Sequence, residues 1–187
     1  MGRAPQWIEA AVPSHSAAYD IVLLAHVLAV LAALVAVVVA GASAVALSRP
    51  GPIPQHLLRY YRPGVNWAGR VLFVVPVLGF VLITLSEGQW AVSDRWIVIG
   101  LVLWLAAATL AEAVLWPAER RLQEAVDRMA ARLSGSSQTN VPEQSGVERT
   151  ETFRPHEVSA LCRRVTAVAG VITAILVGAS VVMVAKP

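Results

Sequence analysis

The sequence predicts an all-α integral membrane protein, a four-transmembrane-helix bundle with both termini extracytoplasmic. Of its 187 residues, 57% are hydrophobic and only 14% are charged, whereas a water-soluble domain carries about 25% charged residues. The apolar residues gather in long uninterrupted runs, and a helix of about 20 such residues crosses a hydrocarbon core of about 30 Å. The charged residues lie mostly between these runs, which is typical of loops at the two membrane surfaces.

Four segments have the length and composition of membrane spans. They lie at about 21–47, 68–85, 96–116 and 165–185. The first contains His26, the second begins around Arg70, the third contains Glu112, and the fourth has no charged residue. Small residues at 41–46 resemble a signal-peptide cleavage site. The apolar run before them is much longer than the ~7–15 residues of a signal core, so a retained span is favoured over a cleaved signal.

The arginines predict the orientation of the spans, because cytoplasmic loops are enriched in positive charge. The loop between the second and third spans has a single arginine, Arg95, beside Glu87 and Asp94. The other two loops are rich in arginine, with Arg49, Arg59, Arg62 and Arg70 in the first and Arg120, Arg121, Arg128, Arg132, Arg149, Arg154, Arg163 and Arg164 in the third. These loops are therefore expected in the cytoplasm of a multi-pass cell-membrane protein. The basic excess is explained by topology, and no nucleic-acid partner is predicted.

The third span is expected to continue into the cytoplasm as a helix. Apolar residues recur at helical spacing at Leu122, Val126, Met129 and Leu133, and Pro117 is expected to kink the helix near the membrane surface. The apolar stripe is predicted to pack along the protein's own surface, with a partner-binding face as the alternative. The polar stretch 134–152 has almost nothing to bury and is predicted to be a flexible cytoplasmic linker.

Small residues predict how the spans pack, because small side chains let helix backbones approach closely in lipid. The candidate packing residues are Ala29, Ala33, Ala36 and Ala40 in the first span and Gly170, Ala174 and Gly178 in the fourth. Packing within one chain is the preferred interpretation, with self-association as the alternative. In the second span, Pro76 frees a backbone carbonyl that a neighbouring group must satisfy.

Ionisable residues inside spans are candidates for function because they are costly to place there. Arg70 and Glu112 are expected at similar depth, so an ion pair that locks the second and third spans is predicted. The alternatives are a proton or ion path through Glu112, or a Glu112 side chain that reaches the membrane surface.

His26 is predicted to form a hydrogen bond across helices, for example with Thr84 or Ser86. The alternative is that it binds haem b or a metal through a ring nitrogen. A bis-histidine haem would need a second histidine at membrane depth, and His15, His56 and His156 all lie outside the spans. No cofactor, metal site or catalytic residue is therefore predicted. The sequence also lacks a phosphate-binding loop, an HExxH motif and a G-x-S-x-G motif.

Three runs resemble a known family: YRPGVNWAGR at 61–70, VPVLG at 75–79 and AEAVLWPAERR at 111–121. The chain resembles a family of uncharacterised bacterial integral membrane proteins, a domain of unknown function grouped loosely with the copper-resistance-protein-D-like four-helix membrane proteins. His26 early in the first span fits that pattern. Because some relatives in the wider group are similar to haem-binding membrane proteins, the resemblance implies haem as an alternative cofactor.

These observations predict a structural or accessory membrane protein, and a subunit of a larger membrane complex is one form of this role. Because the sequence lacks the enzyme motifs named above, a non-enzymatic role is the preferred interpretation. Its expected partners are the lipid bilayer and a membrane protein, either a different one or a second copy. Two alternatives stay open: a haem-associated or redox protein that uses His26, and a small transporter or proton path that uses Glu112.

Overall fold

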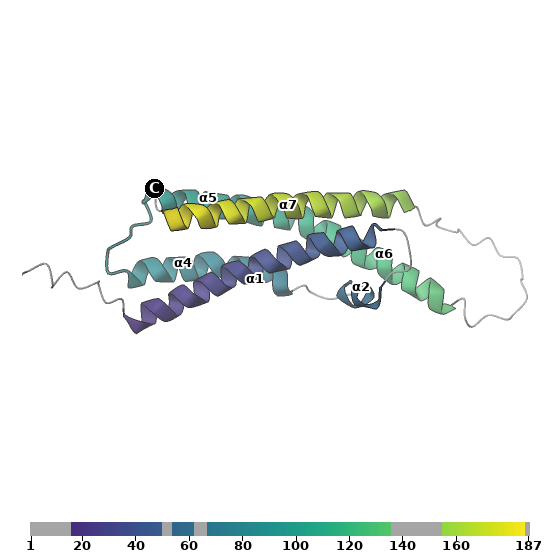
Figure 1. The fold of residues 1–187 in the computed structure, drawn as a ribbon, viewed down its shortest axis with the longest axis horizontal. Helices are drawn as coiled ribbons and strands as arrows, with labels where there is room; N and C mark the ends of the chain where they lie inside the picture. Colours follow the sequence, from purple (N-terminus) through teal and green to yellow (C-terminus); the bar gives the residue numbers. More distant parts are fainter. Residues whose placement is uncertain (1–15, 50–53, 62–66, 136–154, 186–187) are drawn as a thin grey trace, which may run out of the picture.

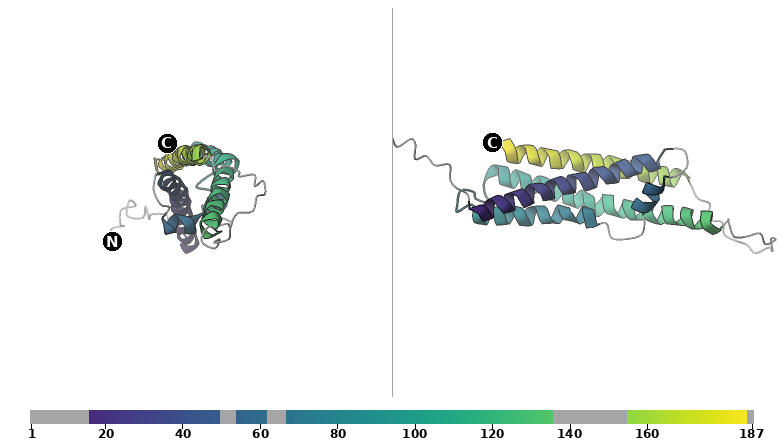
Figure 2. Two further views of the ribbon diagram at one scale, coloured as in Figure 1. Left: turned by 90° about the vertical axis from the view of Figure 1, so that its right-hand side faces the viewer. Right: turned by 60° about the horizontal axis from the view of Figure 1, so that its bottom comes forward.

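The computed structural model describes residues 16–49, 54–61, 67–135 and 155–185. In these ranges every regular element is helical, which confirms the all-α prediction for this part of the chain. Four long segments run side by side: α1 contacts α7 and α4, and α7 also contacts α5 (Figure 1). The end-on and tilted views agree with this arrangement (Figure 2).

The first long helix, α1 (Ala17–Leu47), begins at Ser16, whose side chain accepts a hydrogen bond from the Tyr19 amide. Such a cap satisfies an amide that has no partner inside the helix. The alanines that the sequence singled out lie toward the bundle: Ala29, Ala33 and Ala40 are buried and Ala36 is half-buried.

The second apolar segment is built from three short pieces. They are α3 (Trp67–Arg70), the 3₁₀ turn η2 (Val71–Phe73) and α4 (Val74–Leu85), and the short helix α2 (Gln55–Tyr60) precedes them in the chain. Pro76 has no amide hydrogen to give to the carbonyl four residues earlier, which belongs to Leu72, and its ring crowds that position. The tightened turn lies at this point. The Leu72 carbonyl accepts a hydrogen bond from the Trp104 indole instead, at 2.9 Å.

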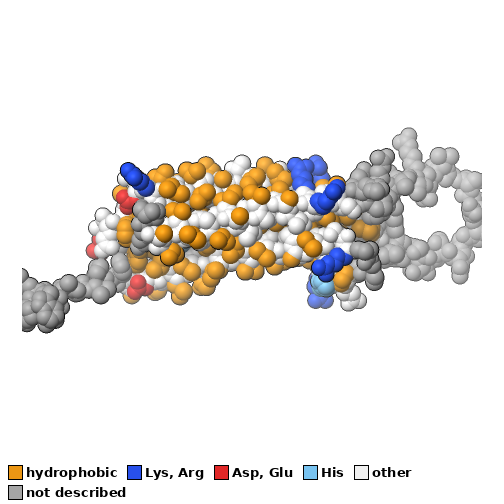
Figure 3. All heavy atoms as spheres, turned by 45° about the horizontal axis from the view of Figure 1, so that its top comes forward, with side chains coloured by type: hydrophobic (Ala, Val, Ile, Leu, Met, Phe, Trp, Pro, Cys, Tyr) orange, Lys and Arg blue, Asp and Glu red, His pale blue; other side chains and the backbone are white. Residues whose placement is uncertain are grey.

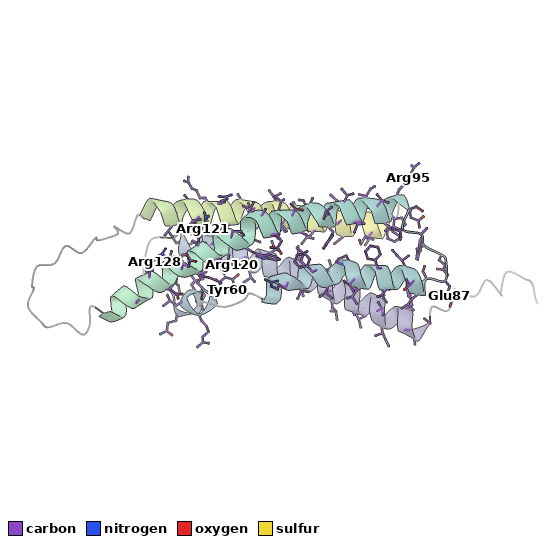
Figure 4. The ribbon with its side chains drawn as sticks, turned by 180° about the vertical axis from the view of Figure 1, so that it is seen from behind. Tyr60, Glu87, Arg95, Arg120, Arg121 and Arg128 are labelled. Carbon is purple, nitrogen blue, oxygen red and sulfur yellow. The ribbon has the colours of Figure 1, made fainter. Side chains whose placement is uncertain are left out.

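The third segment is one continuous helical path with a widened turn. It consists of α5 (Arg95–Leu110), the π-helical turn η3 (Ala111–Leu115) and α6 (Trp116–Gly135). The Trp116 amide bonds to the Ala111 carbonyl, five residues earlier, directly before Pro117, which has no amide hydrogen to donate. Figure 4 shows that α6 diverges from the direction of α5 beyond this turn. The kink expected from Pro117 is therefore present, and a π-helical turn forms it.

The last helix, α7 (Pro155–Ala185), packs against α1, α5 and α6. Its inward face consists of Cys162, Val165, Ala169, Ile172, Leu176 and Ala179. The sequence predicted a different face: Gly170 and Ala174 are exposed, and a Cβ built on Gly170 or Gly178 meets no atom within 4 Å. The close approach of α1 and α7 occurs instead at Gly41, where a built Cβ would lie 3.0 Å from the Ala169 Cβ.

Three helices are long and apolar enough to cross a membrane, namely Ala17–Leu47, Arg95–Met129 and Val158–Ala185. The segment Val71–Leu85 is apolar but shorter. Apolar side chains cover the flank of the bundle along most of its length (Figure 3), as expected where lipid rather than water surrounds the protein. The predicted linker at 134–152 lies outside the described residues except for its first two, which end α6.

Candidate functional site

His26 is buried where α1 meets α4, with 8% of its surface exposed. Its Nδ1 atom has no hydrogen-bond partner, and the ring forms a hydrogen bond with the backbone of Val75. Gly79 borders the ring: a Cβ built on it would lie 3.4 Å from Cε1 and 3.9 Å from Nδ1 of His26. The imidazole is therefore held against the backbone of α4.

The partners expected for His26 are engaged elsewhere. The Thr84 hydroxyl donates to the Val81 carbonyl, and the Ser86 hydroxyl donates to the Ile83 carbonyl, each at 2.7 Å. Both bonds lie within the end of α4, so the predicted link from His26 to these hydroxyls is not formed. The buried Nδ1 is left unsatisfied, which costs free energy in a folded protein.

The same geometry tests whether His26 fits a haem iron. One ring nitrogen forms a hydrogen bond with the backbone of Val75. The other, Nδ1, is buried beside Gly79. An iron at Nδ1 would need α4 to move away from α1. No group of three or more His, Cys, Asp or Glu side chains in the described ranges could hold a metal ion. The arrangement in this structure therefore does not fit an axial haem ligand without rearrangement.

Arg70 and Glu112 do not form an ion pair with each other in the described part of the chain. The guanidinium carbon of Arg70 lies 5.9 Å from the ring centroid of Trp116, within the range of a cation–π interaction. Glu112 is exposed on the π-helical turn. Its carboxylate therefore lies on the outer surface of the bundle, and the ion pair predicted for these two residues is not formed.

An aromatic cluster joins the second and third segments at the same level. The ring of Phe73 lies 6.2 Å from that of Trp104 and 5.8 Å from that of Trp116, measured between centroids. Gly69 lets the Trp116 ring come close, because a Cβ there would be 2.9 Å from the indole nitrogen. These contacts, rather than an ion pair, hold the second segment to the third.

A buried polar cluster at the arginine-rich end was not predicted from the sequence. The Tyr60 hydroxyl, at the end of α2, donates a 2.7 Å hydrogen bond to Oε1 of Glu119 on α6. Glu119 is 4% exposed, and the neighbouring Tyr61 and Cys162 are each 1% exposed. Burial raises the pKa of the Tyr61 hydroxyl, and the nearby Cys162 and Glu119 add to the rise. The end of α2 and the following Tyr61 are therefore docked into the core.

The apolar stripe of α6 also belongs to this core. Leu122 is fully buried and Val126 is 2% exposed, and both pack with Tyr61 and Cys162 in one apolar cluster. This outcome is the predicted intramolecular packing, and it leaves no room on this face for a partner helix. The sequence contained one signal for the burial of Glu119: helical spacing places it on the same face as the apolar stripe of α6.

Comparisons with protein-family models, with curated proteins and with solved structures found no match to this chain.

Proposed function

We propose that the chain is a non-enzymatic structural or accessory protein of the cell membrane, which spans the bilayer four times and serves as a subunit of a larger membrane assembly. Both termini lie outside the cytoplasm in this proposal. The argument rests on the length of the second segment, on the distribution of arginine and on an outward helix face that has no partner within the chain.

The length of the second segment supports the fourth span. The apolar stretch Val71–Leu85 is preceded directly by α3, so the helical path begins at Trp67. At a rise of ~1.5 Å per residue such a path is about 28 Å long, close to the thickness of the hydrocarbon core. Trp67 and Arg70 at its start are residue types that suit a membrane surface. The arginine counts of the loops support the orientation.

The main support for an accessory role is the outward face of α7. Gly170 and Ala174 are exposed, and no atom of the chain lies within 4 Å of a Cβ built on Gly170 or Gly178. Small residues spaced by four are the common contact surface between helices in lipid. Because α7 uses its other face for α1 and α5, this face is available to a helix of another membrane protein or of a second copy.

Site-directed cross-linking in native membranes tests this proposal. Ala174→Cys, made in a Cys162→Ala background, is treated with a short bifunctional thiol or thiol-to-amine reagent. Val102→Cys is the matched control, because Val102 is also exposed but lies on α5, away from the small residues. An adduct formed from position 174 and not from position 102 supports the proposal, and its mass distinguishes a second copy from another protein. Equal labelling at both positions, or none at either, contradicts it.

The haem-associated alternative would use the buried Nδ1 of His26, which has no hydrogen-bond partner, and it requires α4 to move away from α1 so that iron can reach this atom. The visible spectrum of the protein purified in mild detergent, oxidised and then reduced with dithionite, tests it. A Soret band that shifts on reduction and is lost in His26→Ala would establish the alternative. A colourless protein from haem-replete cells removes it. Glu112, exposed on the outer surface, gives no comparable support to a proton path through the bundle.

A further inference from the structure

Exposed arginines form a band near one end of the bundle. Figure 3 shows basic side chains gathered near this end of the apolar flank, whereas acidic side chains mark the opposite end. The five residues that we call the arginine belt are contributed by the end of α1, by α2, by α3 and by the first turns of α7. They are Arg49, Arg59, Arg70, Arg163 and Arg164, all exposed. Among the described residues at the opposite end, Asp20, Glu87 and Asp94 accompany one arginine, Arg95.

The belt arginines are not neutralised within the described residues. No ion pair joins any of them to an acid in those ranges, and Arg70 contacts the Trp116 ring instead. Two acids of the third segment do not pair with the belt arginines. Glu119 is buried and bonded to Tyr60, and Glu112 is exposed one helical turn before Trp116.

On α6 acids alternate with arginines along the helix, whereas the belt lacks this arrangement. This helix has four arginines, Arg120, Arg121, Arg128 and Arg132, and three acids, Glu119, Glu124 and Asp127, of which Glu119 is buried. Glu124 lies four residues before Arg128, the favourable order for a pair on a helix surface. The belt has no acid interleaved in this way, so its positive potential is not cancelled locally.

We infer that the arginine belt binds the headgroups of anionic phospholipids in the leaflet that surrounds this end of the bundle. The ligand chemistry is a phosphate diester held at the surface of an apolar body. Guanidinium groups match phosphate oxygens with two parallel hydrogen bonds and remain charged, which lysine does less well. This inference requires that the helices cross the bilayer, but it does not depend on a protein partner at α7.

The depth of the belt favours lipid over a dissolved anion. Arg70 lies against Trp116, and tryptophan prefers the boundary between hydrocarbon and headgroups. The apolar faces of α1 and α7 continue directly from Arg49 and from Arg164 into exposed valines and leucines. A headgroup at this level would place its acyl chains along those faces. A free phosphate would gain only the electrostatic part of this interaction.

Lipid binding by the purified full chain in detergent tests the inference. The probes are phosphatidylglycerol and phosphatidylcholine, each labelled on an acyl chain so that the headgroup is unchanged. The belt variant is R163Q/R164Q, and the matched control R95Q/R128Q also removes two exposed arginines, one at the opposite end and one on α6, four residues after Glu124. We expect the wild-type chain to bind phosphatidylglycerol at least about fivefold more tightly than phosphatidylcholine. This preference should fall in R163Q/R164Q and persist in R95Q/R128Q.

Two further measurements keep the test decisive. Millimolar inorganic phosphate should not displace the labelled phosphatidylglycerol, and displacement would show a site for free anions instead. In the wild-type chain alone, the preference should disappear at about 1 M salt, where the screening length is ~3 Å. Equal binding of the two lipids at low salt, or the same loss of preference in both double variants, would overturn the inference. Helical circular dichroism and gel filtration establish that each variant is folded.

Discussion

The indole nitrogen of Trp104 on α5 donates a hydrogen bond to the carbonyl oxygen of Leu72, 32 residues away in the chain. Leu72 is the residue four positions before Pro76, so its carbonyl is the one that proline leaves without a helical partner. In the interior of a membrane bundle no bulk water can take that place. A side chain of one segment therefore completes the backbone of another.

Removing this donor is expected to destabilise the bundle. Trp104→Phe keeps an aromatic ring beside Phe73 but leaves the Leu72 carbonyl unsatisfied, at an expected cost of about 1–3 kcal/mol in unfolding free energy. Pro76→Ala offers an amide hydrogen in place of the indole. The cost of Trp104→Phe should therefore be smaller in a Pro76→Ala background. Unfolding in mixed detergent micelles measures the cycle, and equal costs in both backgrounds would rule out this role for Trp104.

Two glycines with opposite surroundings should respond differently to the same substitution. Gly41→Leu places a side chain where even a Cβ would lie 3.0 Å from the Ala169 Cβ, so overpacking between α1 and α7 should cost about 1–3 kcal/mol or more. Gly170→Leu projects into open space and should leave the stability of the isolated chain unchanged or raise it. Thermal unfolding of both variants in detergent measures the difference. Similar losses in both would mean that the outward face of α7 is not free.

The sequence predicted those features that depend on local composition and failed where a contact joins distant residues. Pro76 identified a carbonyl in need of a donor, although nothing in the sequence pointed to Trp104 as the donor. Long apolar runs predicted four spans. Three of them are helices of membrane-spanning length, and the second is the shorter apolar segment Val71–Leu85. The alanines of α1 lie toward the bundle as expected. The small residues of α7 look alike whether they face a neighbour or lipid, so their periodicity could not show that Gly170 and Ala174 point outward.

The polar contacts were likewise missed because they join residues that are distant in the chain. The hydrogen bond between Tyr60 and Glu119 spans 59 residues, and no spacing rule connects a short helix such as α2 to a helix so distant in the chain. Arg70 and Glu112 were paired because their expected depths agree. Depth does not determine the direction around a helix axis, however, and Glu112 lies on the outer surface of the bundle.

His26 should be replaceable by an apolar residue of similar size if its role is packing. His26→Leu removes the unsatisfied Nδ1, which offsets the lost bond to Val75, so the unfolding free energy should stay the same or increase. His26→Ala should lower it by about 2 kcal/mol or more, because it leaves a cavity beside Gly79. Unfolding curves of the two variants decide the matter. A large loss in His26→Leu would point to a role for the ring nitrogens.

The bond between Tyr60 and Glu119 should hold α2 against α6 (Figure 4). Tyr60→Phe removes a donor to a buried carboxyl group, and we expect a loss of about 1.5–3 kcal/mol in the free energy that keeps α2 docked. Hydrogen exchange of the α2 amides reports this local opening directly. Tyr19→Phe, at the start of α1 and far from α2 in the bundle, is the control (Figure 1). Unchanged exchange in α2 of the Tyr60 variant would show that apolar contacts alone dock this helix.

Alkaline pH should destabilise the protein through Tyr61. Burial, with help from Cys162 and Glu119, raises the pKa of its hydroxyl in the folded state, whereas in the unfolded chain it titrates near the ordinary value of about 10. The folded state therefore holds this proton more tightly. The contribution of this proton to the unfolding free energy is fully present below pH ~10. It is lost as the pH rises from there toward the higher folded-state pKa. Tyr61→Phe cannot ionise and should lose less stability than the wild type between pH 9 and about 11. Unfolding midpoints at these two pH values test the argument, and parallel losses in both proteins would assign the alkaline transition to another group.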